Sequence, residues 1–145
     1  MNVFTIGFTK TTAEHFFSRL ITEEIKRLID VRLKNTSQLS GFAKAKDLEY
    51  FSRLIGGIDY VHEPLLAPSE TILKAYKKEK GEWDVYEKRF MDLMSDRRIE
   101  ERLSLDFFDK GCLLCSEAEP HNCHRRLVVE YLNGWWDGRL KVKHL

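Results

Sequence analysis

Strand-length apolar runs alternate with helical patterns over the first 62 residues of the chain. The run VFTIGF at residues 3–8 is rich in β-branched and aromatic side chains and contains Gly7, which is typical of a buried strand that runs into a turn. Thr11 and Glu14 have the spacing of a capping box, so we expect a helix to begin there, with its apolar face at residues 16, 17, 20 and 21. A second apolar run, LIDVRL at 28–33, completes a βαβ unit, which implies a right-handed crossover and two parallel strands.

The middle of the chain adds a helix, a strand and a long charged segment. Apolar residues at 48, 51 and 54 have helical spacing, and a glycine pair separates them from a third strand at residues 58–62. From about residue 69 to 105 the chain is charged and its apolar residues recur with a helical period, and Gly81 divides this segment into two helices. The basic run KAYKKEK at 74–80 is typical of a solvated helix face, with binding to phosphate groups as the alternative.

The last third of the chain predicts a strand, a helix and a final strand. The run GCLLCSE at 111–117 is apolar and turns polar at its end, and CHRRLVVEYLNG at 123–134 has a helical pattern that ends at Gly134. The alternating stretch DGRLKVKHL at 137–145 follows an Asp-Gly turn, which leaves antiparallel pairing of this strand open. We therefore predict an α/β fold: a three-layer Rossmann-like sandwich with a mostly parallel sheet of about five strands, built by residues 1–145 as a single domain.

Composition narrows the classes of function. The chain has 145 residues, 43% of them hydrophobic, and no apolar run approaches the roughly 20 residues of a membrane-spanning helix. The start MNVFTIGFTK lacks the charge and apolar pattern of a signal peptide, so we interpret it as a strand and expect a cytoplasmic protein with no membrane partner. Three cysteines, an odd number, favour reduced thiols, metal binding or catalysis over a disulfide framework. The net charge of +1 exerts no overall attraction for nucleic acid, so any anion must be bound by a local site.

Polar residues gather where the predicted strands end. In open parallel sheets the ligand crevice lies beyond the carboxyl ends of the strands. The residues at these positions are Gly7 to Lys10, Asp30 with Arg32, His62 with Glu63, and Cys115 to Glu119. Asp30 and Arg32 point to the same side of a strand, so they either form an ion pair or face the crevice together. We expect the site at this edge of the sheet.

The segment LLCSEAEPHNCHRRL at 113–127 concentrates reactive side chains. Cys112 and Cys115 lie three positions apart on a strand and so point to opposite faces, which assigns Cys112 to the core and leaves Cys115 at the strand end. Asn122 is a candidate N-cap, which would place Cys123, His124 and Arg125 in the first helical turn. Unpaired backbone N–H groups and neighbouring positive charge would then lower the pKa of the Cys123 thiol.

Three interpretations of this segment stay open. In the first, Cys115, Cys123 and either His121 or His124 hold zinc, with Glu117 as a further ligand. In the second, Cys115 or Cys123 is a nucleophile with His124 as its base, while Arg32 and Arg125 hold an anionic substrate. In the third, ion pairs, caps and packing account for the segment without chemistry. Three cysteines are too few for a typical iron–sulfur cluster, and the carboxylates of the loop argue against a cysteine phosphatase.

A family resemblance rests on these same residues. The stretches TIGFT, LIDVRL, GIDYVH, LLCSEAEPHNCHR and VKHL together resemble the family numbered 488 among domains of unknown function. The specific parts are Asp30-Val31-Arg32, Cys115-x-Glu117 and Cys123-His124-Arg125, and the resemblance implies that these positions form the site of a cytoplasmic single-domain α/β protein. Cys112 and His121 lie outside the motif.

The sequence thus leads to a crevice with a definite set of candidate residues. The candidates for catalysis are Cys115, Cys123, His124, Glu117 and Asp30; those for binding an anionic substrate are Arg32, Arg125, Gly7 and Thr9; and those for holding zinc are Cys115, Cys123 and His124. The leading hypothesis is an enzyme that acts on a small anionic or nucleotide-like substrate through a thiol or a thiol-bound metal. The alternatives are a module that binds nucleotide or nucleic acid, and an interaction domain with a structural metal.

Overall fold

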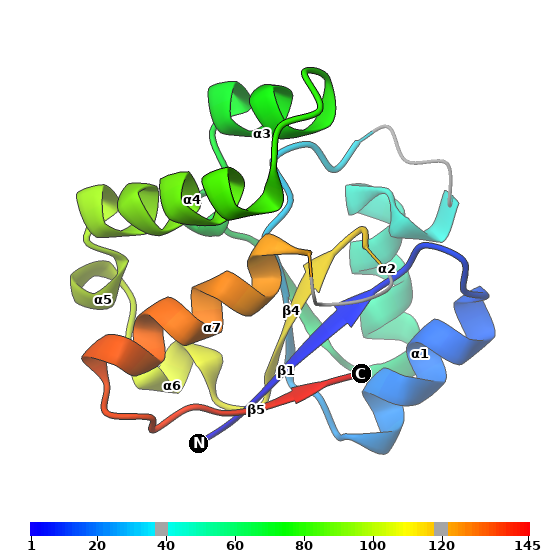
Figure 1. The fold of residues 1–145 in the computed structure, drawn as a ribbon. Helices are drawn as coiled ribbons and strands as arrows, with labels where there is room; N and C mark the ends of the chain where they lie inside the picture. The colour runs from blue at the N-terminus through cyan, green and yellow to red at the C-terminus, as the bar shows by residue number, and fades with distance from the viewer. Residues whose placement is uncertain (37–40, 118–121) are drawn as a thin grey trace.

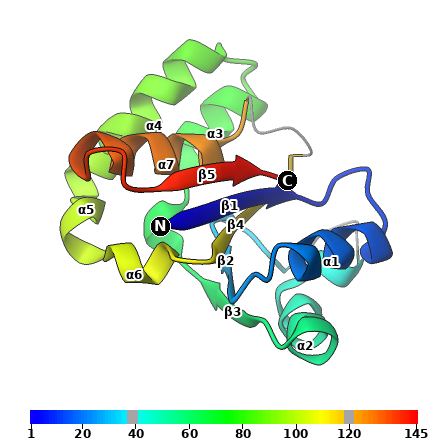
Figure 2. The same ribbon diagram turned by 90° about the horizontal axis from the view of Figure 1, so that it is seen from below.

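Five parallel strands form one sheet at the centre of the protein. A computed structural model describes residues 1–36, 41–117 and 122–145. The strands are β1 (Asn2–Gly7), β2 (Arg27–Asp30), β3 (Asp59–His62), β4 (Gly111–Cys115) and β5 (Lys141–His144). Their order across the sheet is β3-β2-β4-β1-β5, as Figure 2 shows from below. The predicted α/β fold with a mainly parallel sheet is therefore confirmed.

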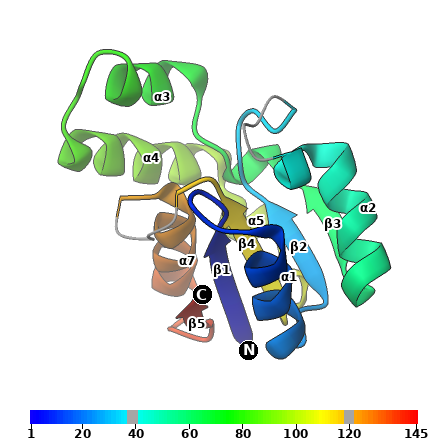
Figure 3. The same cartoon turned by 90° about the vertical axis from the view of Figure 1, so that its right-hand side faces the viewer.

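Helices cover both faces of the sheet. One face carries α1 (Ala13–Thr22) and α2 (Ala45–Gly56) (Figure 1). The other face carries α4 (Trp83–Arg97), α5 (Ile99–Arg102), α6 (Leu105–Phe108) and α7 (His124–Trp135). Helix α3 (Glu70–Lys77) packs on α4 and lies beyond the carboxyl ends of the strands (Figures 1 and 3). Two short 3-10 turns, η1 (Gly41–Ala43) and η2 (Pro64–Leu66), complete the elements in the described part of the chain.

Strand alternation divides the apolar side chains between two cores. On β4, Cys112 and Leu114 belong to the core under α1 and α2, whereas Leu113 and Cys115 belong to the core under α4 and α7. This confirms that Cys112 and Cys115 point to opposite faces. Cys112 is completely buried, and burial raises the pKa of its thiol, as expected for a cysteine that acts as a small apolar residue.

Helix boundaries follow the local sequence signals with small shifts. Helix α1 is capped by Thr12, whose hydroxyl accepts a hydrogen bond from the His15 N–H, and not by Thr11. Helix α7 begins one residue after its N-cap Cys123, so the prediction of Asn122 as N-cap and of Cys123 in the first turn is wrong. The prediction that α7 ends at Gly134 is also wrong, because the helix continues to Trp135 and ends at the C-cap Trp136.

The last strand is parallel, and the antiparallel alternative is wrong. Residues Asn2 to Thr5 of β1 pair in parallel register with Lys141 to His144 of β5. The Asp-Gly turn joins α7 to β5 and does not join two strands, so it is not a hairpin turn. Helix α7 returns the chain to the amino end of the sheet, where the N–H of Lys141 donates to the Met1 carbonyl and β5 starts beside β1. Parallel pairing follows from this crossover.

The connections place a switch point at β4. From β1 the chain moves through α1, β2 and α2 to β3 at one edge, and from β4 it moves through α7 to β5 at the other edge. The crossover after β2, through α2, and the crossover after β4, through α7, lie on opposite faces, so the segments that follow these two neighbouring strands diverge at their carboxyl ends. No helix in the described part of the chain has the length and apolar character needed to cross a membrane.

Candidate functional site

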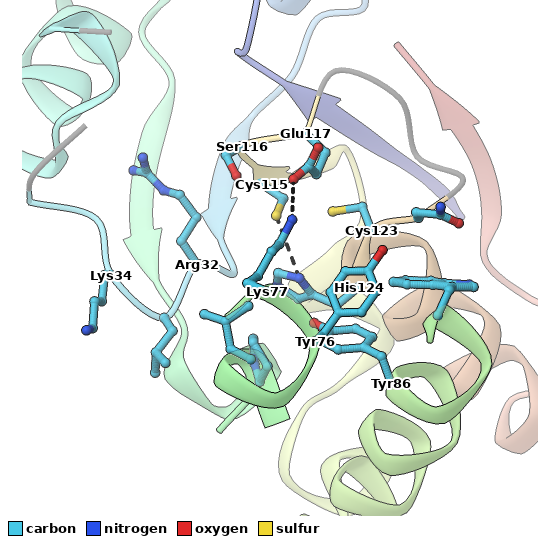
Figure 4. A pocket seen from close by; sticks show the side chains of 15 residues that line it. Arg32, Lys34, Tyr76, Lys77, Tyr86, Cys115, Ser116, Glu117, Cys123 and His124 are labelled. Atoms are coloured by element: carbon cyan, nitrogen blue, oxygen red, sulfur yellow. Dashed lines mark hydrogen bonds and ion pairs between the residues drawn. The ribbon is translucent and has the colours of Figure 1, made fainter. Parts of the chain in front are cut away.

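A pocket of about 130 Å³ opens beyond the carboxyl ends of β2 and β4 (Figure 4). Its walls come from three segments: residues 32–34 after β2, side chains of α3 and α4, and the residues around the β4–α7 connection. An engineered apolar cavity of about 150 Å³ holds a benzene molecule, so this pocket has room for a chemical group of a similar size. Of the predicted site residues, Cys115, Cys123, His124, Glu117 and Arg32 line it, whereas Asp30, Arg125, Gly7 and Thr9 do not.

Cys115 and His124 form a buried thiol–imidazole pair. The Cys115 Sγ lies 3.6 Å from Nδ1 of His124, and Nε2 of the same ring lies 2.7 Å from the Val31 carbonyl oxygen. Since a carbonyl only accepts hydrogen bonds, Nε2 carries a proton, and Nδ1 is the nitrogen that faces the Cys115 sulfur. The imidazole ring also packs against Phe90, with centroids 5.4 Å apart. A base held by an orienting group beside a thiol is the arrangement that activates a nucleophile.

Electrostatics favour the thiolate form of Cys115. A hydrogen bond from Cys123, together with the positive charges of His124 and Arg125, lowers the pKa of Cys115 well below its usual range despite the cost of burial. Burial disfavours the charged form of His124, but the Cys115 thiolate and the Val31 carbonyl outweigh it and raise the pKa of the ring. Both shifts favour a thiolate–imidazolium pair.

Cys123 has the opposite character to the one that its sequence position suggested. It is 2% exposed, it precedes the first turn of α7, and its extended backbone (φ −138°, ψ 139°) places it outside the helix. Its hydrogen bond to Cys115 and its burial raise the pKa of the Cys123 thiol, although Arg125 acts in the other direction. The prediction of a lowered pKa at Cys123 is therefore wrong, because its thiol donates a hydrogen bond to Cys115, and Cys123, His124 and Arg125 together stabilise charge on Cys115 instead.

Asp30 and Arg32 form a buried ion pair behind the pocket. The two oxygens of Asp30 accept hydrogen bonds from Nε and Nη2 of Arg32 at 2.8 and 2.7 Å, and Nη1 of Arg32 donates to the Ala43 carbonyl at 2.7 Å. The Asp30 carboxylate also accepts from Tyr60 Oη at 2.5 Å and from Asn35 Nδ2 at 3.3 Å. Burial alone would raise the pKa of Asp30, but Arg32 and Tyr60 lower it. The Arg32 guanidinium points away from the two cysteines (Figure 4).

Gly7, Thr9 and Arg125 hold the backbone that follows Cys115. The N–H of Thr9 donates to the Ser116 carbonyl at 3.0 Å, its hydroxyl donates to the same oxygen, and Nη1 of Arg125 donates to the Glu117 carbonyl. A Cβ at position 7 would overlap the Glu117 carbonyl oxygen, so only glycine allows this approach. These three predicted anion-binding residues, like Asp30, lie behind the pocket wall and contact protein groups.

Glu117 and Lys77 meet at the mouth of the pocket. Nζ of Lys77 on α3 lies 2.9 Å from Oε1 of Glu117, and both side chains are about half exposed (Figure 4). The aromatic rings of Tyr76, Trp83 and Tyr86 form the wall beneath this ion pair, with Trp83 stacked on Tyr86 at 5.0 Å. The sequence identified Lys77 only as part of a basic helix face, because nothing in the local pattern places α3 over the end of β4.

The geometry also admits a metal ion. One ligand atom from each of Cys115, Cys123 and His124 lies within 4.8 Å of the other two. Two thiolates and one imidazole with an open fourth position match the donor set of catalytic zinc sites, and the Val31 carbonyl orients the ring as an outer partner would. Of the other predicted ligands, Glu117 pairs with Lys77, and His121 lies outside the described residues. Glu119, which the sequence placed at the end of the strand, also lies outside them.

One family of known proteins matches most of the chain. The model of a family described as a domain of unknown function, DUF488, matches residues 12–132. The matched range contains Asp30, Arg32, the two pocket cysteines and His124, whereas Gly7 and Thr9 precede it. No curated protein and no solved structure matches the chain. Since the match extends over most of the sequence, the chain belongs to the DUF488 family.

Proposed function

We propose that this protein is an enzyme in which the Cys115 thiolate attacks a small anionic or nucleotide-like substrate and His124 is the general acid and base. One observation carries the proposal: Cys115 Sγ lies 3.6 Å from a His124 nitrogen whose ring is oriented by the Val31 carbonyl, on the wall of a pocket. Nδ1 of His124 takes the thiol proton, and the thiolate forms a bond to an electrophilic atom of the substrate. The bond between that atom and its leaving group breaks, and the imidazolium gives the proton to the leaving group.

The charge around the pocket supports an anionic substrate. A second, more open groove of about 530 Å³ shares Leu33, Lys34, Leu73 and Lys77 with the pocket, and four lysines and one glutamate line it. The reacting end of a substrate would occupy the pocket beside Cys115, and its anionic part would lie in the groove. An exposed ion pair contributes only about 0–1 kcal/mol, so a substrate phosphate or carboxylate can replace Glu117 as the partner of Lys77 at little cost.

The aromatic wall supports a planar group on the substrate. The side chains of Tyr76, Trp83 and Tyr86 line the pocket next to the lysine groove. Aromatic faces stack on bases by about 1–3 kcal/mol each, and lysines neutralise phosphates. This combination is the reason to include nucleotide-like substrates.

The three free cysteines fit a reducing compartment, and we propose that the protein is located in the cytoplasm.

Alkylation of Cys115 as a function of pH tests the nucleophile. We expect the rate with iodoacetamide in the metal-free protein to rise with an inflection below the ordinary thiol pKa of about 8.5. His124→Gln should move this inflection upward, because the imidazolium no longer stabilises the thiolate. His15→Gln, at an exposed position of α1, is the matched control and should leave it unchanged. An ordinary inflection in the folded wild-type protein would contradict the proposal.

A comparison of two alkylating reagents tests the preference for anions. Iodoacetate carries a negative charge and iodoacetamide does not, so their rate ratio at Cys115 measures the attraction of the lysines. We expect a higher ratio than for a free thiol, and a several-fold lower ratio in the double variant Lys74→Gln/Lys78→Gln with no change in the iodoacetamide rate. Lys141→Gln on β5 serves as the control. A ratio that the double variant leaves unchanged would refute the role of the groove.

A zinc site is the second candidate, favoured by the grouping of Cys115, Cys123 and His124 within 4.8 Å. The metal would either bind a substrate at an open coordination position that faces the pocket, or stabilise the fold of an interaction domain. Zinc titration of the chelator-treated protein tests it: one equivalent of zinc should protect both cysteines from iodoacetamide. If zinc gives no protection and the purified protein contains no stoichiometric metal, this candidate is excluded. Binding of a nucleotide or nucleic acid in the lysine groove, without reaction at Cys115, is the outcome expected of a pure binding module.

A further inference from the structure

The thiols of Cys115 and Cys123 lie side by side and share one hydrogen bond. Their sulfur atoms belong to the group whose members all lie within 4.8 Å, and Figure 4 shows them pointing toward one another across the pocket wall. Nδ1 of His124 lies 3.6 Å from Cys115 Sγ, and both cysteines line the pocket. Two neighbouring thiols beside an imidazole base form the arrangement of a pair that reacts with an oxidant in two steps.

We propose that Cys115 and Cys123 form a redox-active dithiol that reduces a small hydroperoxide and closes into a disulfide. The proposal rests on the proposed function, because it uses the same Cys115 thiolate and the same His124 proton. It adds a second reactive residue, Cys123, and a different chemical class of substrate. Both cysteines line the pocket, so an oxidant of a few atoms reaches Cys115 by the route that a substrate would take.

The first step oxidises Cys115. Its thiolate attacks the terminal oxygen of the hydroperoxide, so that an S–O bond forms and the O–O bond breaks. The leaving alkoxide takes the proton of the His124 imidazolium, which lies at 3.6 Å from the sulfur, and departs as an alcohol, or as water when hydrogen peroxide is the oxidant. The sulfur has become a sulfenic acid, the peroxide has been reduced, and His124 is neutral.

The second step forms the disulfide. Neutral His124 accepts the Cys123 thiol proton, the new thiolate attacks the sulfur of the Cys115 sulfenic acid, and the S–O bond breaks as the S–S bond forms. Hydroxide leaves with the proton from His124 as water. Two equivalents of a small thiol then reduce the disulfide, forming a small-molecule disulfide and restoring both cysteines.

The fold allows the two sulfurs to approach. A disulfide requires an S–S length of about 2.05 Å, so the side chains must move closer than in the reduced pair. Cys123 has an extended backbone outside α7, and Cys115 is the last residue of β4, so neither change disrupts a helical or a strand interior. Cys112 cannot take part, because it lies in the core on the opposite face of the sheet. The reaction is therefore specific for one pair of cysteines.

Mass spectrometry of the intact, metal-free protein tests the proposal. The reduced protein is treated with one equivalent of hydrogen peroxide and then alkylated with iodoacetamide after unfolding. We expect a mass lower by two hydrogens before alkylation, a peptide that links Cys115 to Cys123, and alkylation of Cys112 alone. Dithiothreitol should restore three alkylated cysteines. Cys112→Ala should form the same disulfide, and Cys123→Ser should stop at a sulfenic acid that dimedone labels at Cys115.

The outcomes separate this proposal from the proposed function. If Cys115 shows the low alkylation inflection but peroxide produces a sulfinic acid or no change in the wild-type protein, the dithiol cycle is refuted while the nucleophile stands. If Cys115 reacts with neither iodoacetamide nor peroxide in the folded protein, both proposals fail. A disulfide that includes Cys112 would also overturn the pairing. Sustained consumption of hydrogen peroxide with excess dithiothreitol, lost in Cys115→Ser, should accompany the disulfide.

Discussion

Replacing Asp30 with asparagine removes the carboxylate that neutralises Arg32 behind the pocket. Asp30 is completely buried and Arg32 is 4% exposed, so the guanidinium of the variant keeps its charge where water does not reach it. The Nε and Nη2 groups of Arg32 each donate to the carboxylate, and Tyr60 donates to it as well. An asparagine side chain offers one oxygen and adds an N–H group that faces these donors. The variant therefore combines an uncompensated charge with lost hydrogen bonds.

The magnitude follows from the burial of both partners. Removing one member of a buried ion pair costs about 3–5 kcal/mol of unfolding free energy. With about 2.1 cal/mol/K of unfolding entropy per residue, a chain of 145 residues should lose about 10–16 °C in melting temperature. The double variant Asp30→Asn/Arg32→Met removes the orphaned charge and should recover a large part of this loss. Asp92→Asn, which breaks an exposed pair with Lys88, is the control and should change stability by less than about 0.5 kcal/mol.

Urea denaturation at several pH values provides the assay. The pKa of Asp30 is lowered in the folded protein, so its contribution is complete above the unfolded pKa of about 3.9 and is lost as the pH falls toward the folded pKa. The difference between wild type and Asp30→Asn should therefore be constant from about pH 5 upward and shrink in more acidic solution. The reasoning would be refuted if Asp30→Asn lost less than about 1 kcal/mol of unfolding free energy at neutral pH, or if the double variant were less stable than Asp30→Asn.

Three further predictions concern the surroundings of the site, each measured by urea denaturation. Gly7→Ala should lower the unfolding free energy by about 1–3 kcal/mol and slow alkylation of Cys115, because its Cβ overlaps the Glu117 carbonyl oxygen. Its control is Gly134→Ala, in open space within α7, which should raise the unfolding free energy by about 0.5–1 kcal/mol. Cys112→Ala should cost about 1 kcal/mol without affecting the pocket, so a large functional loss would contradict its assignment to the core. Asn133→Ala should cost about 1–3 kcal/mol, since its side chain makes two hydrogen bonds to the backbone before β5, and an unchanged midpoint would show that these bonds contribute nothing.

The sequence alone determined the order and kind of the elements around the site. Periods of two and of 3.6 residues depend only on neighbours along the chain, so the strand before Gly7, the helix after Cys123 and the opposite orientations of Cys112 and Cys115 could be predicted before any contact was known. The alternation of strands and helices also implied a parallel sheet with its crevice at the carboxyl ends. The resemblance on the Asp-Val-Arg and Cys-His-Arg segments identified the DUF488 family.

Only the tertiary structure decided which groups meet. β2 lies beside β4, a neighbour distant in sequence, and this pairing brings the Val31 carbonyl to His124 and fixes the ring toward Cys115. The same long-range packing gives Arg32 a buried carboxylate partner, brings Lys77 to the pocket mouth, and reverses the expected reactivity of Cys115 and Cys123. A pKa depends on burial and on charges within a few ångströms, and these arise from contacts between segments that no local pattern encodes.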